Sequence, residues 1–185
     1  MISIFPPKKY RKQIAIEQRF YDTSFRAWIL GYDSWYIGRC LLYMRYAEWY
    51  AINNNSIINK IIGGWEKLLL RKYVRKTGLQ LNLHTCDFGV RFYHLGWCII
   101  NSSARIGKNV TLYPGVCIGH KVAGEAPIIG DNVFIGLGVK VIGKVRIGNN
   151  AIIAPNAVVT KDVPDNAVVA GIPARVIKIK PHDLS

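Results

Sequence analysis

The sequence has few cysteines and no long apolar run, and these absences argue against several classes of protein. Its four cysteines, Cys40, Cys86, Cys98 and Cys117, include no CxxC pair, which argues against a zinc ribbon, a thioredoxin-like site and a disulfide scaffold. No run of about 18 apolar residues is present, so no helix is expected to cross a membrane. The basic start MISIFPPKKYRKQ leads into no continuous apolar core, so we expect no signal peptide. We therefore expect reduced thiols and a cytoplasmic location.

Acidic residues are scarce along the whole chain. The sequence has 25 Lys and Arg against 11 Asp and Glu, a formal net charge of +14. Residues 1–80 hold 14 of the cations and five of the acids, so this part is the more basic. Nucleic acid, an anionic membrane surface and a phosphorylated ligand would each suit such a field, and charge alone does not choose among them.

Residues 1–80 are predicted to form a small α-helical N-terminal region. Apolar residues recur at helical spacing from Ser34, a candidate N-cap, to Ile52. A second helix is expected to begin at Ser56, whose hydroxyl can cap it, and to end at Gly78. Both apolar stripes should face a packing partner. They are Ile37, Leu41, Met44 and Ala47 in the first helix, and Ile57, Ile61, Trp65, Leu68 and Leu69 in the second.

Residues 81–185 form the second predicted domain, in which an aliphatic residue recurs every six positions. A small or β-branched residue follows four positions after nearly every one of them. A sustained period of six fits neither an α-helix nor an alternating strand, and it indicates a solenoid with three short faces per coil. We expect roughly three coils between residues 99 and 163, whereas an ordinary β-sandwich would show turn signals at irregular spacing. The aliphatic positions are Ile100, Ile106, Leu112 and Ile118, then Ile129, Ile135, Val141, Ile147, Ile153 and Val159.

The repeat loses its phase between Ile118 and Ile129, which are eleven residues apart. The segment 119–127 is therefore expected to leave the coil as a loop, and loops on rigid scaffolds often carry binding or chemistry. Ahead of the regular coils, His94 lies in the segment 88–97. By itself, an isolated histidine of this kind is either structural or a catalytic base.

Residues 79–178 resemble the hexapeptide-repeat acyltransferases, in particular their serine acetyltransferase-like branch. The resemblance rests on the strings G-V-R-F-Y-H-L-G, I-I-N-S-S-A-R-I-G-K-N-V, V-C-I-G-H, E-A-P-I-I-G-D-N-V-F-I-G-L-G and V-V-A-G-I-P-A-R-V-I. It implies a mainly β fold, a left-handed parallel β-helix, assembled as a homotrimer with active sites between subunits. It also implies acetyl-CoA as co-substrate, no bound metal, and O-acetyl transfer without a covalent enzyme intermediate.

The same resemblance assigns roles to individual residues. His94 matches the catalytic histidine, and a neutral imidazole can take the proton of a hydroxyl acceptor as its oxygen attacks the thioester. The carboxylate that orients this histidine falls near Asn82, with Asp87 as a candidate substitute. The pantetheine arm of acetyl-CoA would lie near Gly136, Leu137, Gly138, Ala154 and Pro155, and its phosphates near Lys161, Arg175 and Lys178.

Two departures from the serine acetyltransferases guide the choice of acceptor. Tyr93 stands where those enzymes carry an aspartate, and Glu125-Ala126 stand where they carry an Arg-His pair that holds the serine carboxylate. We therefore expect Tyr93, His120 and Glu125 to contact a saccharide hydroxyl, as in the capsular and exopolysaccharide O-acetyltransferases that the sequence resembles. This interpretation predicts a role in polysaccharide biosynthesis, with the basic, aromatic N-terminal region in peripheral contact with the inner face of an anionic membrane.

Three alternatives stay open. Serine could be the acceptor, as in the serine O-acetyltransferases of cysteine biosynthesis. A zinc-dependent carbonic anhydrase would need three histidine ligands, for which the chain offers His84, His94 and His120, with His182 in the tail. A non-catalytic basic trimer could bind nucleic acid or other proteins, although nothing beyond net charge supports nucleic acid as a partner.

Overall fold

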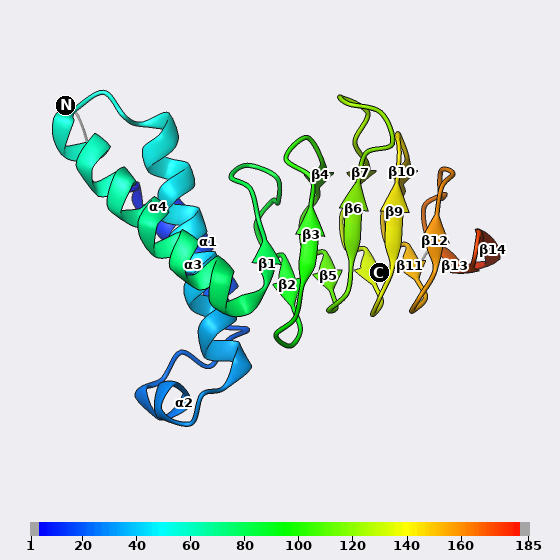
Figure 1. Ribbon diagram of the computed structural model, residues 1–185, viewed down its shortest axis with the longest axis horizontal. Helices are drawn as coiled ribbons and strands as arrows, with labels where there is room; N and C mark the ends of the chain where they lie inside the picture. The colour runs from blue at the N-terminus through cyan, green and yellow to red at the C-terminus, as the bar shows by residue number, and fades with distance from the viewer. Residues whose placement is uncertain (1–3, 182–185) are drawn as a thin grey trace. The chain divides into compact units, whose positions relative to one another are not determined.

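The computed structural model describes residues 4–181, which divide into two compact units, one ending at Gly78 and one beginning at Leu79. The described part of the first unit forms four helices, α1 Lys8–Gln18, α2 Phe25–Ile29, α3 Asp33–Ile52 and α4 Ile57–Thr77 (Figure 1). Within residues 4–181, no helix combines the length and the hydropathy needed to cross a membrane.

Hydroxyl caps and a glycine set several of the helix ends. The Ser56 hydroxyl accepts a hydrogen bond from the Asn59 amide at 3.0 Å, and Gly78 takes a left-handed conformation (φ 76°) at the end of α4, as predicted. The predicted cap at Ser34 is wrong, because α3 begins at Asp33, after an extended Tyr32, so that Ser34 lies inside the helix. Asp33 then lies in the first turn, where its negative charge complements the helix dipole.

α3 and α4 pack against each other, and α4 presents its smallest side chain to the contact. The α3 stripe Ile37, Leu41, Met44 and Ala47 is buried, as predicted. At Gly63 of α4, a Cβ would lie only 2.8 Å from the Cβ of Tyr50, so the helices approach closely because this residue is glycine. The prediction for α4 is wrong, because this approach turns its aliphatic stripe outward. Ile57, Ile61 and Trp65 are 72%, 65% and 62% exposed.

A buried ion cluster joins α1 to α3. The Arg45 guanidinium donates to both carboxylate oxygens of Glu17 and to Glu48, each at 2.9 Å, and all three side chains are buried. Burial alone would lower the pKa of Arg45, but the hydrogen bonds and charges of the two glutamates outweigh it, so the pKa lies above its usual value. Removing the arginine would therefore take away the cation that both buried carboxylates share.

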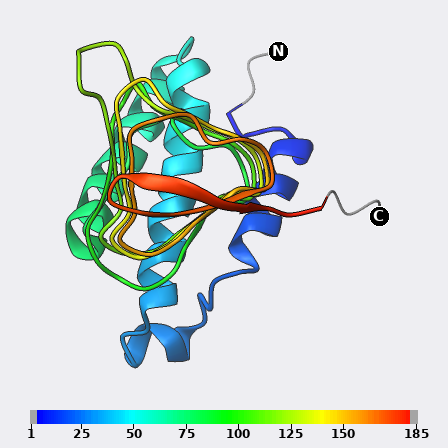
Figure 2. The ribbon, with the colours of Figure 1, turned by 90° about the vertical axis from the view of Figure 1, so that its right-hand side faces the viewer.

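The second unit is a parallel β-solenoid in which three sheets form the three faces of each turn. The first sheet has the order β1-β3-β6-β9-β12, the second β10-β7-β4, and the third β14-β13-β11-β8-β5-β2. Seen along the solenoid axis, the turns overlie one another in a three-sided outline (Figure 2). The predicted fold class, a parallel β-helix with a small helical N-terminal region, is confirmed.

Except for β14, which runs antiparallel to β13, each strand forms one face of one turn, so the strands are short. They are β1 Leu79–Gln80, β2 Arg91–Phe92, β3 Cys98–Ile100, β4 Arg105–Ile106, β5 Thr111–Leu112, β6 Cys117–Gly119, β7 Ile128–Ile129, β8 Phe134–Ile135, β9 Lys140–Ile142, β10 Arg146–Ile147, β11 Ile152–Ile153, β12 Val158–Val159, β13 Ala167–Gly171 and β14 Ala174–Ile179. All ten aliphatic repeat positions from Ile100 to Val159 are buried, as the period of six predicts.

The solenoid is longer than the three coils expected from the repeat. Its first sheet takes one strand from each of five turns, starting with β1 at Leu79. In a regular turn, paired residues are separated by three hexapeptides, as Phe134 and Ile152 are. The repeat pattern does not reveal the first turn, because the spacing of this turn is irregular. Arg91 pairs with Thr111, which lies two positions beyond the partner expected from the regular spacing.

The corners between sheets stack into three edges that run along the solenoid. The histidine edge leads from the third sheet to the first and comprises residues 93–97, 113–116, 136–139 and 154–157. The loop edge leads from the first sheet to the second and comprises residues 81–85, 101–104, 120–127, 143–145 and 160–162. The asparagine edge leads from the second sheet to the third and comprises residues 87–90, 107–110, 130–133, 148–151 and 164–166.

The asparagine edge is a structural ladder. Asn109, Asn132, Asn150 and Asn166 all take the left-handed conformation, with φ between 56° and 59°. The side-chain amide of each donates to the side-chain carbonyl of the next, at 3.2, 3.3 and 3.0 Å. Asparagine tolerates this backbone conformation better than most residues. Its side-chain amide is hydrogen-bonded to the asparagine of the next turn, so this edge stabilises the stacked turns.

Candidate functional site

His94 lies on the histidine edge, in a corner that is longer than the next one. Phe92 pairs with Leu112, two positions beyond the regular partner, whereas Ile99 pairs with Cys117 at the regular spacing of three hexapeptides. The two extra residues therefore lie between Phe92 and Ile99. In this corner His94 takes a left-handed conformation (φ 65°). A residue whose backbone is held in a sparsely populated φ/ψ region is often found at a functional position.

Aromatic rings line the edge next to His94. Tyr93 and Tyr113 stack almost parallel, with 5.1 Å between their ring centroids, and Tyr113 contacts Phe134 at 5.5 Å. The imidazole of His94 lies 6.4 Å from the ring of Tyr113. Tyr93 and His94 are both exposed, so the imidazole has solvent on one side and aromatic surface on the other. A substrate arriving at His94 would contact this aromatic surface.

The corner residues predicted to hold acetyl-CoA stack on the same edge, further along from His94. The Gly138 amide donates to the Pro114 carbonyl at 2.9 Å, and the Asn156 amide donates to the Leu137 carbonyl at 2.7 Å. A Cβ on Gly136 would lie 2.7 Å from the nitrogen of Pro155, so these corners pack backbone against backbone. His94, the segment 136–138 and the Ala154-Pro155 corner therefore share one edge.

The three cations predicted to meet the phosphates are not gathered at one place. Lys161 follows β12 on the loop edge. Arg175 and Lys178 are exposed residues of β14, where Arg175 pairs with Ala170 and Lys178 with Val168. The guanidinium of Arg175 donates to the carbonyl of Ala174 at 3.0 Å. Arg175 therefore lies on β14, two strands beyond the β11 strand that leads into the Ala154 corner, and Lys161 lies on a different edge.

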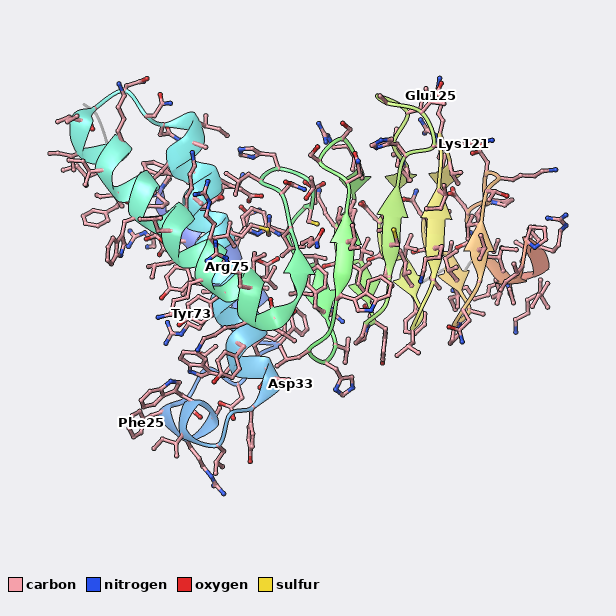
Figure 3. All side chains as sticks on the ribbon, viewed as in Figure 1. Phe25, Asp33, Tyr73, Arg75, Lys121 and Glu125 are labelled. Atoms are coloured by element: carbon pink, nitrogen blue, oxygen red, sulfur yellow. The ribbon has the colours of Figure 1, made fainter. Side chains whose placement is uncertain are left out.

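The residues predicted to contact the acceptor are divided between two edges. Tyr93 adjoins His94, whereas His120 and Glu125 belong to the loop of residues 120–127, which extends beyond the outline of the turns (Figure 2). His120 Nδ1 lies 2.6 Å from the side-chain nitrogen of Asn101, and the Glu125 carboxylate lies 4.0 Å from the Lys144 ammonium. Figure 3 shows Glu125 in the outer part of this loop.

Asn82 and Asp87 do not lie beside His94 in one chain. Asn82 is on the loop edge, where its side-chain amide donates to the Ile100 carbonyl at 3.1 Å. Asp87 is on the asparagine edge, and its backbone amide donates to the Ile106 carbonyl at 2.8 Å. The three residues predicted to be catalytic thus occupy three different edges of the first turn. If either Asn82 or Asp87 orients His94, it comes from another copy of the chain.

Two of the four cysteines are buried thiols with raised pKa values, and the described part of the chain contains no metal-binding cluster. Among residues 4–181, no group of three or more His, Cys, Asp and Glu side chains is placed to hold a metal ion. His182 lies outside the described residues. Burial raises the pKa of Cys98 and raises that of Cys40 to about 12, so both are protonated thiols at neutral pH.

The structure brings together two residues that sequence analysis overlooks, one on the histidine edge and one in the strand beside it. Trp97 ends the long corner and is half exposed, and the ammonium of Lys140 lies 4.8 Å from its ring centroid. The sequence does contain a signal for this corner. The buried residues Phe92 and Ile100 are eight positions apart, whereas six is the rule in the regular turns.

Comparison with known proteins identifies the repeat. Residues 126–161 match the family model "Bacterial transferase hexapeptide (six repeats)". The serine acetyltransferase of Mycobacterium tuberculosis (strain ATCC 25618 / H37Rv) is 45% identical over 87 residues, which are 45% of this chain and 38% of that protein. The match thus spans less than half the length of this curated relative.

Solved structures of serine acetyltransferases have the same fold. The enzyme of Brucella abortus strain S19 matches with a TM-score of 0.72 and 22% identity, covering 93% of this chain and 70% of that one. Its complex with coenzyme A matches with a TM-score of 0.68 at 22% identity, covering 93% and 69%. The Neisseria gonorrhoeae enzyme in complex with serine matches with a TM-score of 0.65 at 22% identity, covering 91% and 69%. At this identity the likeness concerns the fold.

The fold and the repeat define a hexapeptide-repeat β-solenoid protein. More particularly, the curated relative and the solved structures described above are serine acetyltransferases. This finding overturns the predicted saccharide acceptor and, with it, the role in polysaccharide biosynthesis. That prediction rested on Tyr93 and Glu125, and both are exposed residues of connecting segments, where the sequence can change without disturbing the coils.

Proposed function

We propose that the protein is an acetyl-CoA-dependent O-acetyltransferase whose acceptor is the hydroxyl of serine. The observation that carries the proposal is the shared edge: the corner that holds His94 stacks in line with the Gly136–Gly138 corner. The 45% identity with a serine acetyltransferase over 87 residues supports the same activity and the same acceptor.

In the proposed reaction, His94 acts as the general base. The serine hydroxyl gives its proton to the imidazole as its oxygen attacks the thioester carbonyl carbon of acetyl-CoA. The carbon–sulfur bond then breaks, and the imidazolium returns the proton to the departing sulfur, so the products are O-acetylserine and CoA. The enzyme is unchanged at the end, and no cysteine takes part. Backbone amides of the edge are the candidates for stabilising the oxyanion.

We propose that the working form is a homotrimer with its active sites between subunits. The support is the division of the predicted residues within one chain: His94 and Tyr93 lie on the histidine edge, whereas Asn82, His120 and Glu125 lie on the loop edge. Two edges of one three-sided turn are separated by the width of a sheet. A site that joins the histidine edge of one subunit to the loop edge of its neighbour would bring both groups to one substrate.

The test of the activity replaces His94 by a residue that keeps its backbone conformation. His94 has a φ value of 65°, which asparagine tolerates. We expect His94→Asn to lower kcat for serine acetylation by at least about a hundredfold, the usual contribution of a general base. The control Lys108→Met changes an exposed residue of the asparagine edge, which the proposed site does not use, and should keep the activity. Both variants should bind CoA like the wild type. Thiol release from acetyl-CoA with serine measures this, and a wild type that acetylates no serine would contradict the proposal.

We also propose that the first unit contacts an anionic membrane through the outer face of α4. Four residues of the predicted α4 stripe are exposed, Ile57, Ile61, Trp65 and Leu68, and the exposed Ile58 lies next to them. Exposed cations accompany it at Lys60, Lys67, Arg71, Lys72 and Arg75, and the one acid of the helix, Glu66, is partly buried. A helix with this division of apolar and basic residues lies flat on anionic bilayers. A second copy of α4 would instead bring like charges together.

Vesicle flotation at low salt tests the membrane contact. We expect the wild type to float with phosphatidylglycerol vesicles and not with phosphatidylcholine vesicles, because the cations require anionic lipid. Ile61→Ser/Trp65→Ser should abolish flotation. The control Phe25→Ser/Ile29→Ser changes two exposed apolar residues of α2 and should leave it intact. If the α4 variant keeps floating, or if it changes the oligomeric mass in light scattering instead, the stripe serves another contact.

A further inference from the structure

Lys140 connects three successive turns of the histidine edge. Its ammonium donates to the carbonyl of Gly115 and to that of Gly138, each at 2.7 Å. It also lies 4.8 Å from the ring centroid of Trp97. These three partners occupy the corners before β3, β6 and β9, so one side chain holds a corner from each of three neighbouring turns.

The fold alone does not require a lysine at this position. The residues that pair with Lys140 in the neighbouring turns are Cys117 and Val158, and neither carries a charge. The lysine is also only partly buried, in contrast to the aliphatic residues that fill the core. A charged side chain at this single position of the sheet therefore indicates a functional role at the histidine edge.

The partners of Lys140 lie where the proposed reaction needs a fixed backbone. Gly115 and Gly138 have left-handed φ values of 77° and 73°. Glycine adopts this region without steric cost but is not confined to it, so other contacts must fix the backbone there. Charge-assisted hydrogen bonds to their carbonyls fix the direction of both peptide groups. Trp97 belongs to the same long corner as His94, so the cation also ties that corner to the Gly136–Gly138 corner.

We infer that Lys140 is a positioning residue that holds the histidine edge in the shape that binds the pantetheine arm of CoA. This inference rests on the proposed acetyltransferase function. The lysine touches backbone and tryptophan, and it acts on the substrate through them. Binding of CoA should therefore depend on the donors at residue 140 more strongly than the stability of the solenoid does.

Titration calorimetry with CoA tests the inference on the full chain. Lys140→Met removes the donors and keeps the length, and we expect it to weaken CoA binding by about tenfold, the effect of losing one or two charge-assisted hydrogen bonds. Lys140→Arg keeps the charge and the donors and should recover most of the affinity. Lys108→Met removes the same charge from the exposed asparagine edge and should bind CoA like the wild type. In steady-state assays, the KM for acetyl-CoA should rise in Lys140→Met while kcat changes little.

Three results would overturn the inference, and they differ from one another. If Lys140→Met lowers the melting temperature but binds CoA normally, the lysine is only structural, and the proposed function stands. If Lys108→Met weakens binding as much as Lys140→Met does, only the overall charge matters. If the wild type binds no CoA, the proposed function fails and the role of Lys140 fails with it.

Discussion

Removing the loop on the loop edge should leave the solenoid folded and impair only its chemistry. Across this loop Cys117 pairs with Lys140, five positions beyond the regular partner, whereas Lys140 pairs with Val158 at the regular spacing of three hexapeptides. The loop therefore adds five residues to a regular turn. Deleting residues 121–125 would restore the spacing of six between Ile118 and Ile129. It would leave Pro127, which is buried, at the fourth position of the repeat, where Ala104 lies in the turn before.

The energetic cost of this deletion is small. All five residues are exposed, and their interactions are the 4.0 Å pair of Glu125 with Lys144 and a turn within the loop itself. An exposed ion pair contributes about 0–1 kcal/mol, and halving a loop recovers about 0.6 kcal/mol of closure entropy. The two terms oppose each other, so the free energy of unfolding should change by less than about 1 kcal/mol. For a domain of this size, that is a shift in melting temperature of less than about 8 °C.

Circular dichroism, CoA calorimetry and serine kinetics measure the outcome together. We expect a folded variant with unchanged CoA affinity and a KM for serine raised by at least about tenfold, because the loop edge is proposed to meet the acceptor at the histidine edge of a neighbouring subunit. Replacing residues 121–125 by five Gly and Ser residues keeps the loop length and tests its chemistry alone. An unfolded deletion variant would refute the register argument, and unchanged serine kinetics in both variants would refute the role of the loop.

Three further predictions concern stability and thiol chemistry. Asn132→Ala should destabilise the solenoid by about 1–2 kcal/mol in urea unfolding, and Asn132→Gly by less, because glycine accepts the left-handed φ of 58°. Arg45→Met should cost the first unit about 3–5 kcal/mol in urea unfolding, because it removes the buried cation that Glu17 and Glu48 share. The raised pKa of Cys98 keeps its thiol protonated until the pH rises far above neutral, so it should resist alkylation at pH 8 while the less buried Cys117 reacts first. Equal labelling of the two cysteines in mass spectrometry would contradict this last prediction.

The solenoid and its loop could be predicted from the sequence because their signals are local. One inward aliphatic every six residues requires three short faces per turn, whatever the rest of the chain does. Ile118 and Ile129 are eleven residues apart, five more than the repeat of six, and the structure has a loop that adds five residues to a regular turn. Ser56 and Gly78 mark the ends of α4 for the same reason, since a cap depends on residues three or four positions away.

The tertiary structure alone decided which residues share a surface. Gly63 meets Tyr50 of another helix, and that close approach turned the α4 stripe outward although its periodicity was recognisable. The first turn of the solenoid was not evident from the sequence, because irregular corners hide its repeat. Asn82, Asp87 and His94 are near neighbours in the sequence, yet they occupy three edges, because each corner of a turn points in a different direction. Lys140, in contrast, meets Gly115 from the turn before its own and Trp97 from the turn before that. Stacking of distant turns creates such contacts, and no local pattern in the sequence encodes them.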